Sequence, residues 1–499
     1  LYNRDPRFLN RYRWRFSRPA QTLMAHSSHP YRFEAHHAVI EGPSQLLGVR
    51  RTLELSALRL SERLELENTA LEPQTLTLTL EFGADFADLF EARGWFEGSH
   101  EVAVRVAGDG VQGDGVQGDG IQGDGGQGDG GQSDRVRLEH EAADGVRQAL
   151  RLHFSSPPDA LSEREASFEV ALEPGERWSL SVETRLENPL ETNLPGLSYA
   201  DWSAGFALKM PKARHERALA RALEDLRALL LHTRDGPVFA AGIPWFVTVF
   251  GRDSLLAAYM TLPHHPEVAR GTLRYLAARQ GRRHDAFRAE APGKVLHEVR
   301  YGELARTDRI PFKTYYGTID ATPLFVMLLH RLWETSGDGA LLRELRPNWE
   351  GALAWLKTDG DPDGDGLLEF SGAQPGRGLS VQSWKDSHDS LSHADGALAS
   401  GLIAVSEVQG YAYAAYRAAA AFYRVLDEPR EAERWDAEAA AMKRRVHEAF
   451  WLEDLGTYAL ALDGDKRPLR VQNSDAGQLL WSGVVPEAVA PRLARTLFS

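Results

Sequence analysis

The segment 383–390, SWKDSHDS, gathers side chains that could carry out acid–base chemistry. Two carboxylates, Asp386 and Asp389, stand within a few residues of a tryptophan, a lysine and a histidine. A carboxylic acid beside an apolar ring can have its pKa raised and serve as a general acid. A solvated polar turn has the same composition, so both interpretations stay open on spacing alone. Ser387, His388 and Asp389 are consecutive and cannot form a catalytic triad, whose members come from separate segments.

Arg252 and Asp253 follow the aromatic-rich segment 240–250, which contains Trp245. Adjacent arginine and aspartate side chains can donate to and accept from neighbouring sugar hydroxyls, while aromatic rings cover the apolar face of a sugar. An aspartate that caps a helix, next to an ion-paired arginine, explains the same pattern equally well. Asp320 directly precedes an apolar helical pattern, where it could also be a simple helix cap.

Two further patterns resemble metal sites without completing them. The HEVRY segment that begins at His297 places Tyr301 where the H-E-x-x-H zinc motif needs its second histidine. The alternating aspartates of 359–365 resemble a calcium loop, but the twelfth residue counted from Asp361 is Gly372 rather than a bidentate glutamate. The sequence therefore favours a tight acidic turn, and we expect no metal and no cofactor.

The elements that must position these residues fall into two parts. Apolar residues alternate with polar ones over about eight segments of residues 1–190, as in 74–83, which predicts an antiparallel β-sandwich. Leu60, Leu64 and Leu66 keep this period, and Glu62 is the exception among them. Residues 191–212 are predicted as a linker because they are rich in proline, asparagine and glycine.

From residue 213 to 499 the period becomes helical, which predicts an all-α domain built as a bundle or a toroid of helical hairpins. Within the first part, the five-residue repeat GDGVQ over 108–134 is predicted to be a disordered insertion. It contains G-x-G-x-x-G strings but lacks the flanking strand and helix of a nucleotide site.

Composition excludes several classes of function. The 499 residues include no cysteine, so disulfides, thiolate metal sites and cysteine nucleophiles are excluded. The formal net charge of −14 without a basic tract argues against nucleic-acid binding, and no apolar run reaches the roughly 18 residues of a membrane span. We expect a cytoplasmic protein with no nucleic-acid or membrane partner, and the sequence indicates no oligomeric state.

Five segments in a fixed order carry a resemblance to a known family: AGIPWFVTVFGRDSL, GKVLHEVRYGE, YYGTIDATPLF, QSWKDSHDS and SEVQGYAYAAY. They resemble the signature blocks of the amylo-α-1,6-glucosidase family, the glucosidase half of glycogen debranching enzymes. LYNRDPRFLNRY and FGADFADLFEARG resemble the β domain that precedes the catalytic domain in bacterial members. The resemblance implies an (α/α)6 toroid that hydrolyses α-1,6-glucosidic or related linkages with inversion, using a general acid and a general base.

The resemblance also implies roles for single residues. Asp386 matches the general acid of a W-x-D block, with Asp389 as the competing candidate. Arg252, Asp253 and Asp320 match residues that hold the terminal glucose. The remaining residues expected to bind an α-glucan or oligosaccharide are Trp245, His297, Glu298, Trp384, Lys385 and Gln409.

The family's general base lies in a later block than any of these. We therefore expect residues 213–499 to form an incomplete toroid without its base, and residues 1–499 alone not to turn over substrate. Two alternatives stay open. One is another α-toroid glycosidase, acting on α-mannosides, kojibiose-like disaccharides or glycosylglycerates. The other is a non-catalytic carbohydrate-binding protein.

Overall fold

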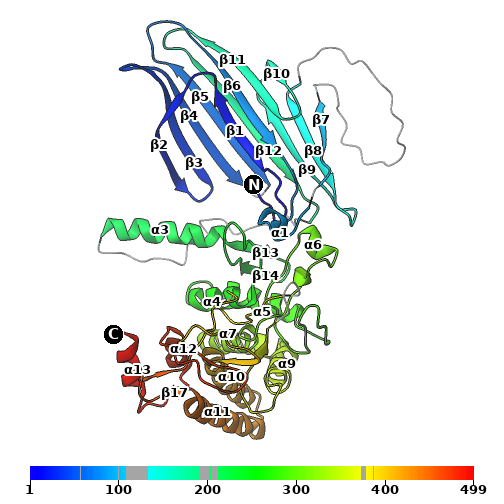
Figure 1. Ribbon diagram of the computed structural model, residues 1–499, viewed down its shortest axis with the longest axis vertical. Coiled ribbons are helices and arrows are strands. Elements are labelled where there is room, and N and C mark those ends of the chain that lie inside the picture. The colour runs from blue at the N-terminus through cyan, green and yellow to red at the C-terminus, as the bar shows by residue number, and fades with distance from the viewer. Residues whose placement is uncertain are drawn as a thin grey trace. The chain divides into compact units, whose positions relative to one another are not determined.

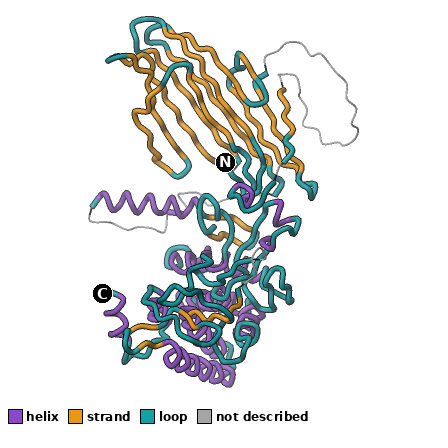
Figure 2. The backbone as a smooth tube through the Cα atoms, viewed as in Figure 1, coloured by secondary structure: helices purple, strands orange, loops and turns teal. Residues whose placement is uncertain are grey.

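The computed structural model describes residues 1–56, 58–98, 100–107, 133–190, 202–203, 212–372, 378–385 and 387–498. The repeat predicted over 108–134 lies outside these residues except for its last two, and so does most of the predicted linker. The chain divides into two compact units, Leu1–Thr192 with Met210–Ala228, and Asn193–Lys209 with Leu229–Ser499. Strands dominate the first unit, and helices with long connections dominate the second (Figure 2).

The first unit contains two antiparallel sheets, with strand orders β2-β3-β4-β5-β12-β9-β8-β7 and β1-β6-β11-β10 (Figure 1). The strands are β1 (Arg11–Phe16), β2 (Ala20–His29), β3 (Arg32–Glu41), β4 (Ser44–Ser56), β5 (Arg59–Asn68), β6 (Gln74–Gly83), β7 (Ala103–Ala107), β8 (Arg135–Glu141), β9 (Arg147–Phe154), β10 (Ala160–Leu161), β11 (Glu165–Leu172) and β12 (Arg177–Glu187). Helix α1 (Leu89–Ala92) follows β6.

The core of this unit lies between the two sheets. Leu76, Leu78 and Leu80 of β6 and Leu64 and Leu66 of β5 are all buried in one apolar cluster. Successive side chains of a strand point to opposite faces, so the alternation in the sequence gives each sheet one apolar face to bury. The predicted β-sandwich is confirmed.

Glu62 keeps the period of β5 and points into this core, although it is charged. Its carboxylate accepts hydrogen bonds from the Tyr12 hydroxyl at 2.7 Å, from Trp14 Nε1 at 2.8 Å and from Arg51 Nε at 2.7 Å. Its side chain has no exposed surface. A buried carboxylate is tolerated when its oxygens are paired in this way, so Glu62 ties β1 and β4 to β5.

Helix α3 (Ala213–Ala228) groups with the first unit, whereas the sequence predicted it as the start of the helical domain. His29 on β2 pairs through Nδ1 with the Glu224 carboxylate at 3.0 Å. Leu223 is the buried residue of this helix. An amphipathic pattern predicts that a helix packs on something apolar, but it does not say on which neighbour.

The second unit is helical, as predicted. Its helices are α4 (Gly251–Thr261), α5 (Pro266–Ala278), α6 (Glu303–Arg306), α7 (Ala321–Ser336), α8 (Gly339–Glu344), α9 (Arg346–Leu356), α10 (Ser406–Val425), α11 (Pro429–Phe450), α12 (Asp475–Ser482) and α13 (Ala490–Leu497), with the 3-10 turn η1 (Pro311–Lys313). Its strands are short: β13 (Leu230–Thr233), β14 (Gly236–Phe239), β15 (Phe370–Ser371), β16 (Leu402–Val405), β17 (Trp451–Leu452), β18 (Thr457–Tyr458) and β19 (Ala461–Leu462).

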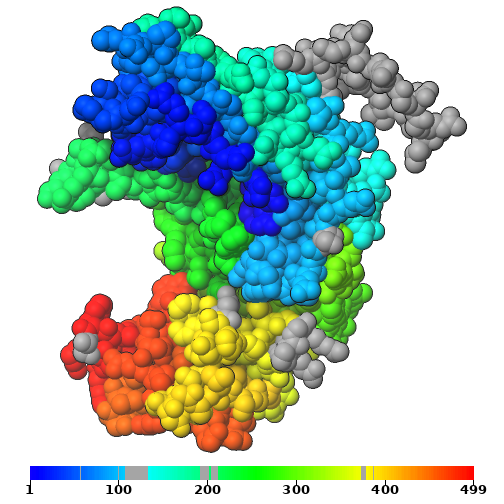
Figure 3. All heavy atoms as spheres, turned by 45° about the horizontal axis from the view of Figure 1, so that its top comes forward, coloured from blue at the N-terminus to red at the C-terminus, as the bar shows by residue number. Residues whose placement is uncertain are grey.

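Helix α10 is the packing centre of this unit, because it contacts α7, α9, α11 and α12. Helix α4 in turn contacts α5 and α7. Segments far apart in the sequence meet here, and the segment after α9 and the C-terminal segments lie side by side on the surface (Figure 3, yellow and orange). None of the helices in the described part of the chain combines the length and apolarity that crossing a lipid bilayer requires.

The buried acid of the β-sandwich gives a test of this packing. Glu62→Ala should lower the free energy of unfolding of the first unit by about 3 kcal/mol, because it leaves Arg51, Tyr12 and Trp14 without their shared acceptor. Glu62→Gln keeps one acceptor oxygen and should cost about half as much. The control Glu65→Ala, on the opposite face of β5, should stay within about 0.5 kcal/mol of wild type. Urea unfolding measures all three, and equal losses for both alanine variants would contradict the role given to Glu62.

Candidate active site

Four helices of the second unit contribute a carboxylate from their N-terminal ends. Asp253 lies in the first turn of α4, Asp320 is the N-cap residue of α7, Glu407 lies in the first turn of α10, and Asp475 begins α12. The N-terminal end of a helix carries unpaired N–H groups and the positive end of its dipole, so it stabilises negative charge. The four helices pack in sequence, α4 on α7, α7 on α10 and α10 on α12, and their carboxylates lie close enough for Asp320 to act on both Asp253 and Glu407 and for Asp475 to act on Glu407.

Two glycines allow these helices to approach so closely. A Cβ at Gly251 would collide with the Leu296 carbonyl oxygen and would lie 3.0 Å from the Cβ of Ala321. A Cβ at Gly410 would lie 2.6 Å from Ser482 Oγ of α12. The glycines before Arg252 and after Glu407 thus help to bring the four carboxylates together.

Arg252 and Asp320 form a buried ion pair. Arg252 Nη1 donates to Asp320 Oδ2 at 2.9 Å, and Thr318 Oγ1 donates to the other oxygen of Asp320 at 2.5 Å. Asp320 stands at the N-cap position of α7, but its side chain makes no capping hydrogen bond there. Asp253 is not a cap either, because Phe250 is the N-cap residue of α4. The capping interpretation is therefore wrong for Asp253, and Asp320 occupies the predicted N-cap position without a side-chain cap.

Asp253 is the accessible member of this group. Its Oδ2 lies 3.9 Å from Arg252 Nε, and its side chain is 40% exposed, whereas that of Asp320 is 1% exposed. Burial raises the pKa of Asp253, the nearby Arg252 lowers it, and Asp320 raises it further. A ligand can reach this carboxylate while Arg252 and Asp320 hold their mutual geometry.

Asp475 holds the segment that the sequence predicts to carry the acid. Its Oδ1 accepts from Trp384 Nε1 at 3.0 Å and from Lys385 Nζ at 3.1 Å. The Lys385 ammonium also lies 4.1 Å from the centre of the Trp384 ring, which is 44% exposed. Asp386 lies outside the described residues, directly after this anchored pair, and Asp389 is exposed.

Glu407 is buried in the same group, and no cation of the described residues forms an ion pair with it. Burial raises its pKa well above the ordinary value, the negative charges of Asp475 and Asp320 raise it further, and Lys385 opposes them. Its Oε2 has no hydrogen-bond partner among the residues that the structure describes, and the same holds for Asp475 Oδ2. Burial also raises the pKa of Asp475, but Lys385 and Trp384 lower it. The surroundings thus favour the protonated form of Glu407, whereas Lys385 and Trp384 favour the charged form of Asp475.

The other predicted residues occupy different surroundings. His297 is buried between the Phe250 and Tyr315 rings, and burial and the charge of Arg252 lower its pKa well below the ordinary value, so the ring is neutral. Glu298 is buried and pairs with Arg300 at 2.6 Å. Both side chains, His297 and Glu298, are thus buried rather than exposed to solvent.

Trp245 and Gln409 also differ from each other in exposure. Trp245 is partly exposed, and its carbonyl oxygen accepts from Arg300 at 2.9 Å. Gln409 is fully buried, and its amide bonds to the backbone of Leu368 at 2.7 and 2.8 Å and to the Val405 carbonyl at 3.1 Å. Its side chain joins α10 to the loop before β15.

Glu407 and Asp475 are the site residues that sequence reasoning missed. Each is one acidic residue near the start of a helix, which is a common and unremarked position. Glu407 does stand in the SEVQGYAYAAY block, but only packing shows that it faces two other carboxylates. No spacing along the chain links residue 475 to residue 384.

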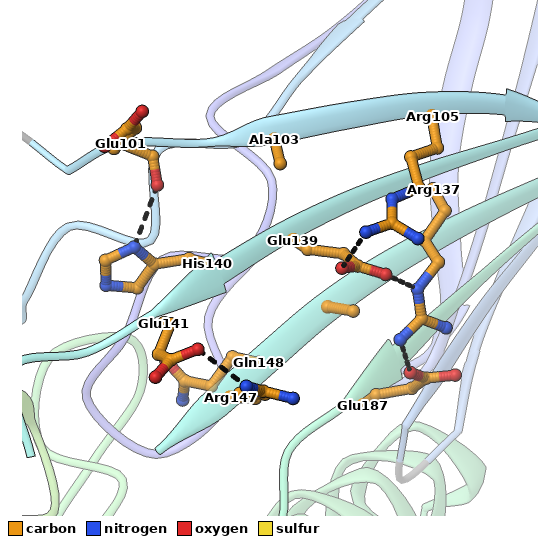
Figure 4. A pocket seen from close by; sticks show the side chains of 11 residues that line it. Glu101, Ala103, Arg105, Arg137, Glu139, His140, Glu141, Arg147, Gln148 and Glu187 are labelled. Atoms are coloured by element: carbon orange, nitrogen blue, oxygen red, sulfur yellow. Dashed lines mark hydrogen bonds and ion pairs between the residues drawn. The ribbon is translucent and has the colours of Figure 1, made fainter. Parts of the chain in front are cut away.

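A cavity of about 690 Å³ in the first unit does not resemble a sugar site (Figure 4). Its charged residues neutralise one another, since Arg137 pairs with Glu139 and Glu187, and Arg147 pairs with Glu141. No Trp, Tyr or Phe ring is among its lining residues, so it lacks the apolar platform that a sugar ring stacks on.

The comparisons with known proteins agree with this division. Residues 1–183 match the family described as the N-terminal domain of some glycogen debranching enzymes. Residues 250–498 match the mannosylglycerate hydrolase MGH1-like glycoside hydrolase domain. A comparison with curated proteins gives no match.

Among solved structures, the chain is similar to a GH78 family rhamnosidase of Bacillus sp. GL1, with 12% identity and a TM-score of 0.41. The match covers 93% of this chain and 39% of the rhamnosidase chain. This likeness is distant, and the two family matches carry the assignment. Since they follow one another along the chain and cover the sandwich and most of the helical unit, the chain belongs to the glycoside hydrolases of the glycogen debranching enzyme type.

Proposed function

We propose that this glycoside hydrolase cleaves α-1,6-glucosidic bonds of α-glucans with inversion and needs no cofactor. The observation that carries the proposal is the convergence of carboxylates from four helix ends around Arg252 and Lys385, beside an exposed tryptophan. Such a group offers donors, acceptors and an apolar face within one sugar-sized area. The proposal keeps the (α/α)6 arrangement expected from the resemblance, and the α10–α11 hairpin is consistent with it.

In this proposal Arg252 and Asp253 bind vicinal hydroxyls of the terminal glucose, and the buried Asp320 acts through Arg252. The buried Arg252–Asp320 pair fixes the guanidinium, and the more exposed Asp253 accepts from a hydroxyl. The Trp384 ring stacks on the sugar with the face opposite the Lys385 ammonium. Trp245 lies in the aromatic segment that leads into α4 and completes the apolar wall.

Asp386 donates the proton to the leaving glycosidic oxygen as the C1–O bond breaks. A water molecule attacks C1 from the opposite face and gives its proton to a general base, roughly 6.5–9.5 Å from the acid in inverting enzymes. Asp475 acts as a positioning residue, because it holds Trp384 and Lys385 directly before Asp386. Two observations argue against the buried carboxyls as the base: the pKa of Glu407 is raised, and Asp475 already accepts from two donors.

A second candidate is hydrolysis of an α-mannosyl glycerate, favoured by the family match over residues 250–498. Such a substrate carries a carboxylate next to the scissile bond. Lys385, whose ammonium lies at the site and already binds one carboxylate, has the charge to receive it. The two candidates share the sugar-binding residues and differ in the group that leaves.

Sugar binding can be tested directly on residues 1–499. Arg252→Lys keeps the charge but loses the planar fork, so it should weaken isomaltose binding at least tenfold in isothermal titration. The control Arg270→Ala removes a partly exposed pair with Asp338 and should leave the affinity unchanged within twofold. Wild-type affinity in Arg252→Lys would contradict the proposed sugar site.

The acid assignment is tested by substrates with different leaving groups. In a form of the protein that turns over a 1,6-branched dextrin, Asp386→Asn should lower kcat by about 10²- to 10⁴-fold while isomaltose affinity survives. The same variant should lose much less activity on α-glucosyl fluoride than on dextrin, because fluoride leaves without being protonated. NMR of the first product should show β-glucose. If Asp389→Asn gives these effects and Asp386→Asn does not, the acid is Asp389. Faster cleavage of mannosylglycerate than of dextrin by the wild type would favour the second candidate.

The raised pKa of Glu407 predicts a pH-dependent stability. Its folded pKa is raised above 4.5, so the folded state holds the proton more tightly and the free energy of unfolding falls as pH rises above about 4.5. Glu407→Gln does not titrate, so its stability relative to wild type should grow between pH 5 and 8, by up to about 1.4 kcal/mol per pH unit. Urea unfolding at three pH values measures this slope.

Glu428→Gln is the matched control. Its pairing with Arg346 lowers the pKa of Glu428, so this group is ionised in both states above pH 5 and the slope should match wild type. Parallel pH profiles of wild type and Glu407→Gln would show that Glu407 is ionised in the folded protein.

A further inference from the structure

The eight-stranded sheet of the first unit ends in β2, which pairs with β3 on one side and with no described strand on the other (Figure 1). The outer side of such a strand presents unpaired N–H and C=O groups that can pair with another strand. Strand β2 runs over ten residues, Ala20–His29, and the eight residues between its two ends are all exposed. It therefore offers a long, open edge for strand pairing.

The other sheet edges of this unit carry features that prevent such pairing. Strand β7 has five residues and contains Arg105, β10 has two residues, and β1 contains three arginines. Charges and short length protect an edge, because a second strand would have to bury the charge or would gain few hydrogen bonds. The sequence of β2, AQTLMAHSSH, has no Lys, Arg, Asp, Glu or Pro. Of the four edges in the described part of this unit, β2 is the one without these safeguards.

Exposed apolar side chains accompany this edge. Leu23 and Met24 of β2 are 55% and 50% exposed, and Tyr31 and Phe33, where β3 begins, are each 41% exposed. Pairing of the backbone supplies direction and register, whereas burial of apolar side chains supplies most of the free energy of association. The edge thus combines both contributions in one place.

The charged residues near the end of β2 are balanced within the chain. Arg32 pairs with Glu34 at 2.6 Å and with Glu54 at 3.2 Å, and His29 pairs with Glu224 at 3.0 Å. Like charges directly opposite each other destabilise a strand pair, but β2 itself has no Lys, Arg, Asp or Glu to bring together. An identical strand is therefore a suitable partner.

We propose that β2 pairs with β2 of a second copy of this chain, antiparallel about a twofold axis, so that the two eight-stranded sheets continue into each other. One uncharged strand then serves both sides, as in any isologous interface. Opposite residues of an antiparallel pair lie on the same face, so the axis passes through a residue rather than between two. Residues 24–26 are the regularly paired stretch of β2 between two bulges, which puts the axis at Met24 or Ala25, in the middle of the strand.

Sedimentation velocity of residues 1–499 over a concentration series tests this proposal. We expect a dimer that dissociates on dilution, and Met24→Lys should weaken it at least tenfold, because the strand pair would have to accommodate two like charges. Val106→Lys is the matched control, since it adds the same charge at a 44% exposed residue on the β7 edge of the same sheet, and it should change the dissociation constant less than twofold. A chain that stays monomeric up to roughly 100 µM, or a dimer weakened by Val106→Lys and not by Met24→Lys, would overturn the proposal.

Cross-linking locates the axis, because the chain contains no cysteine that could compete. Met24→Cys and Ala25→Cys, made separately, each place one thiol at a possible centre of the pair. At the axis the two Cα atoms would lie about 4.5–5.5 Å apart, which is within the range of a disulfide. At least one of the two variants should therefore give a covalent dimer on mild oxidation, seen in a non-reducing gel, and Val106→Cys should not. Monomers from both β2 variants would show that β2 does not pair with itself and would leave this edge to an extended strand of a different protein.

Discussion

The buried ion pair between Arg252 and Asp320 is the interaction on which the site depends. It joins the first turn of α4 to the cap of α7, and neither partner could lie there alone, because an unpaired buried charge costs several kcal/mol. The pair takes up one of the two cations of the group. Lys385 supplies the other to Asp475, whereas burial and the neighbouring carboxylates raise the pKa of Glu407. The surroundings of the carboxyl groups thus differ in the cations available to each.

The N-terminal ends of the helices explain how four carboxylates can lie close together. Four N-terminal turns offer partial positive charge, and close packing at Gly251 and Gly410 brings them together. In the acidic loop before β15, the Lys466 ammonium balances part of the negative charge of the clustered carboxylates. Gln409 joins that loop to α10. The two acidic groups of the helical unit are therefore linked through the most central helix.

Much of the fold follows from local rules. Alternation along residues 1–190 predicted the sandwich, because a strand with one apolar face must bury it, and the helical period predicted the second unit. The local rules failed where long-range contacts decide. Glu62 interrupts the apolar pattern but obeys the period, since Tyr12, Trp14 and Arg51 satisfy it inside the core. Helix α3 has the expected amphipathic pattern and groups with the sheets.

The sequence by itself determined the residue types available for chemistry, the order of the blocks that carry them, and the exclusion of thiol chemistry by the lack of cysteine. It predicted Arg252, Asp253 and Asp320 as candidate sugar-binding residues, because they stand in segments that resemble the family's signature blocks. Only the tertiary structure decided that the side chain of Asp320 pairs with Arg252 instead of capping α7, that Glu407 and Asp475 join this pair, and that Gln409 is buried. The reason is physical: the protonation and role of a carboxyl group depend on burial and on charges from distant segments, and spacing along the chain encodes neither.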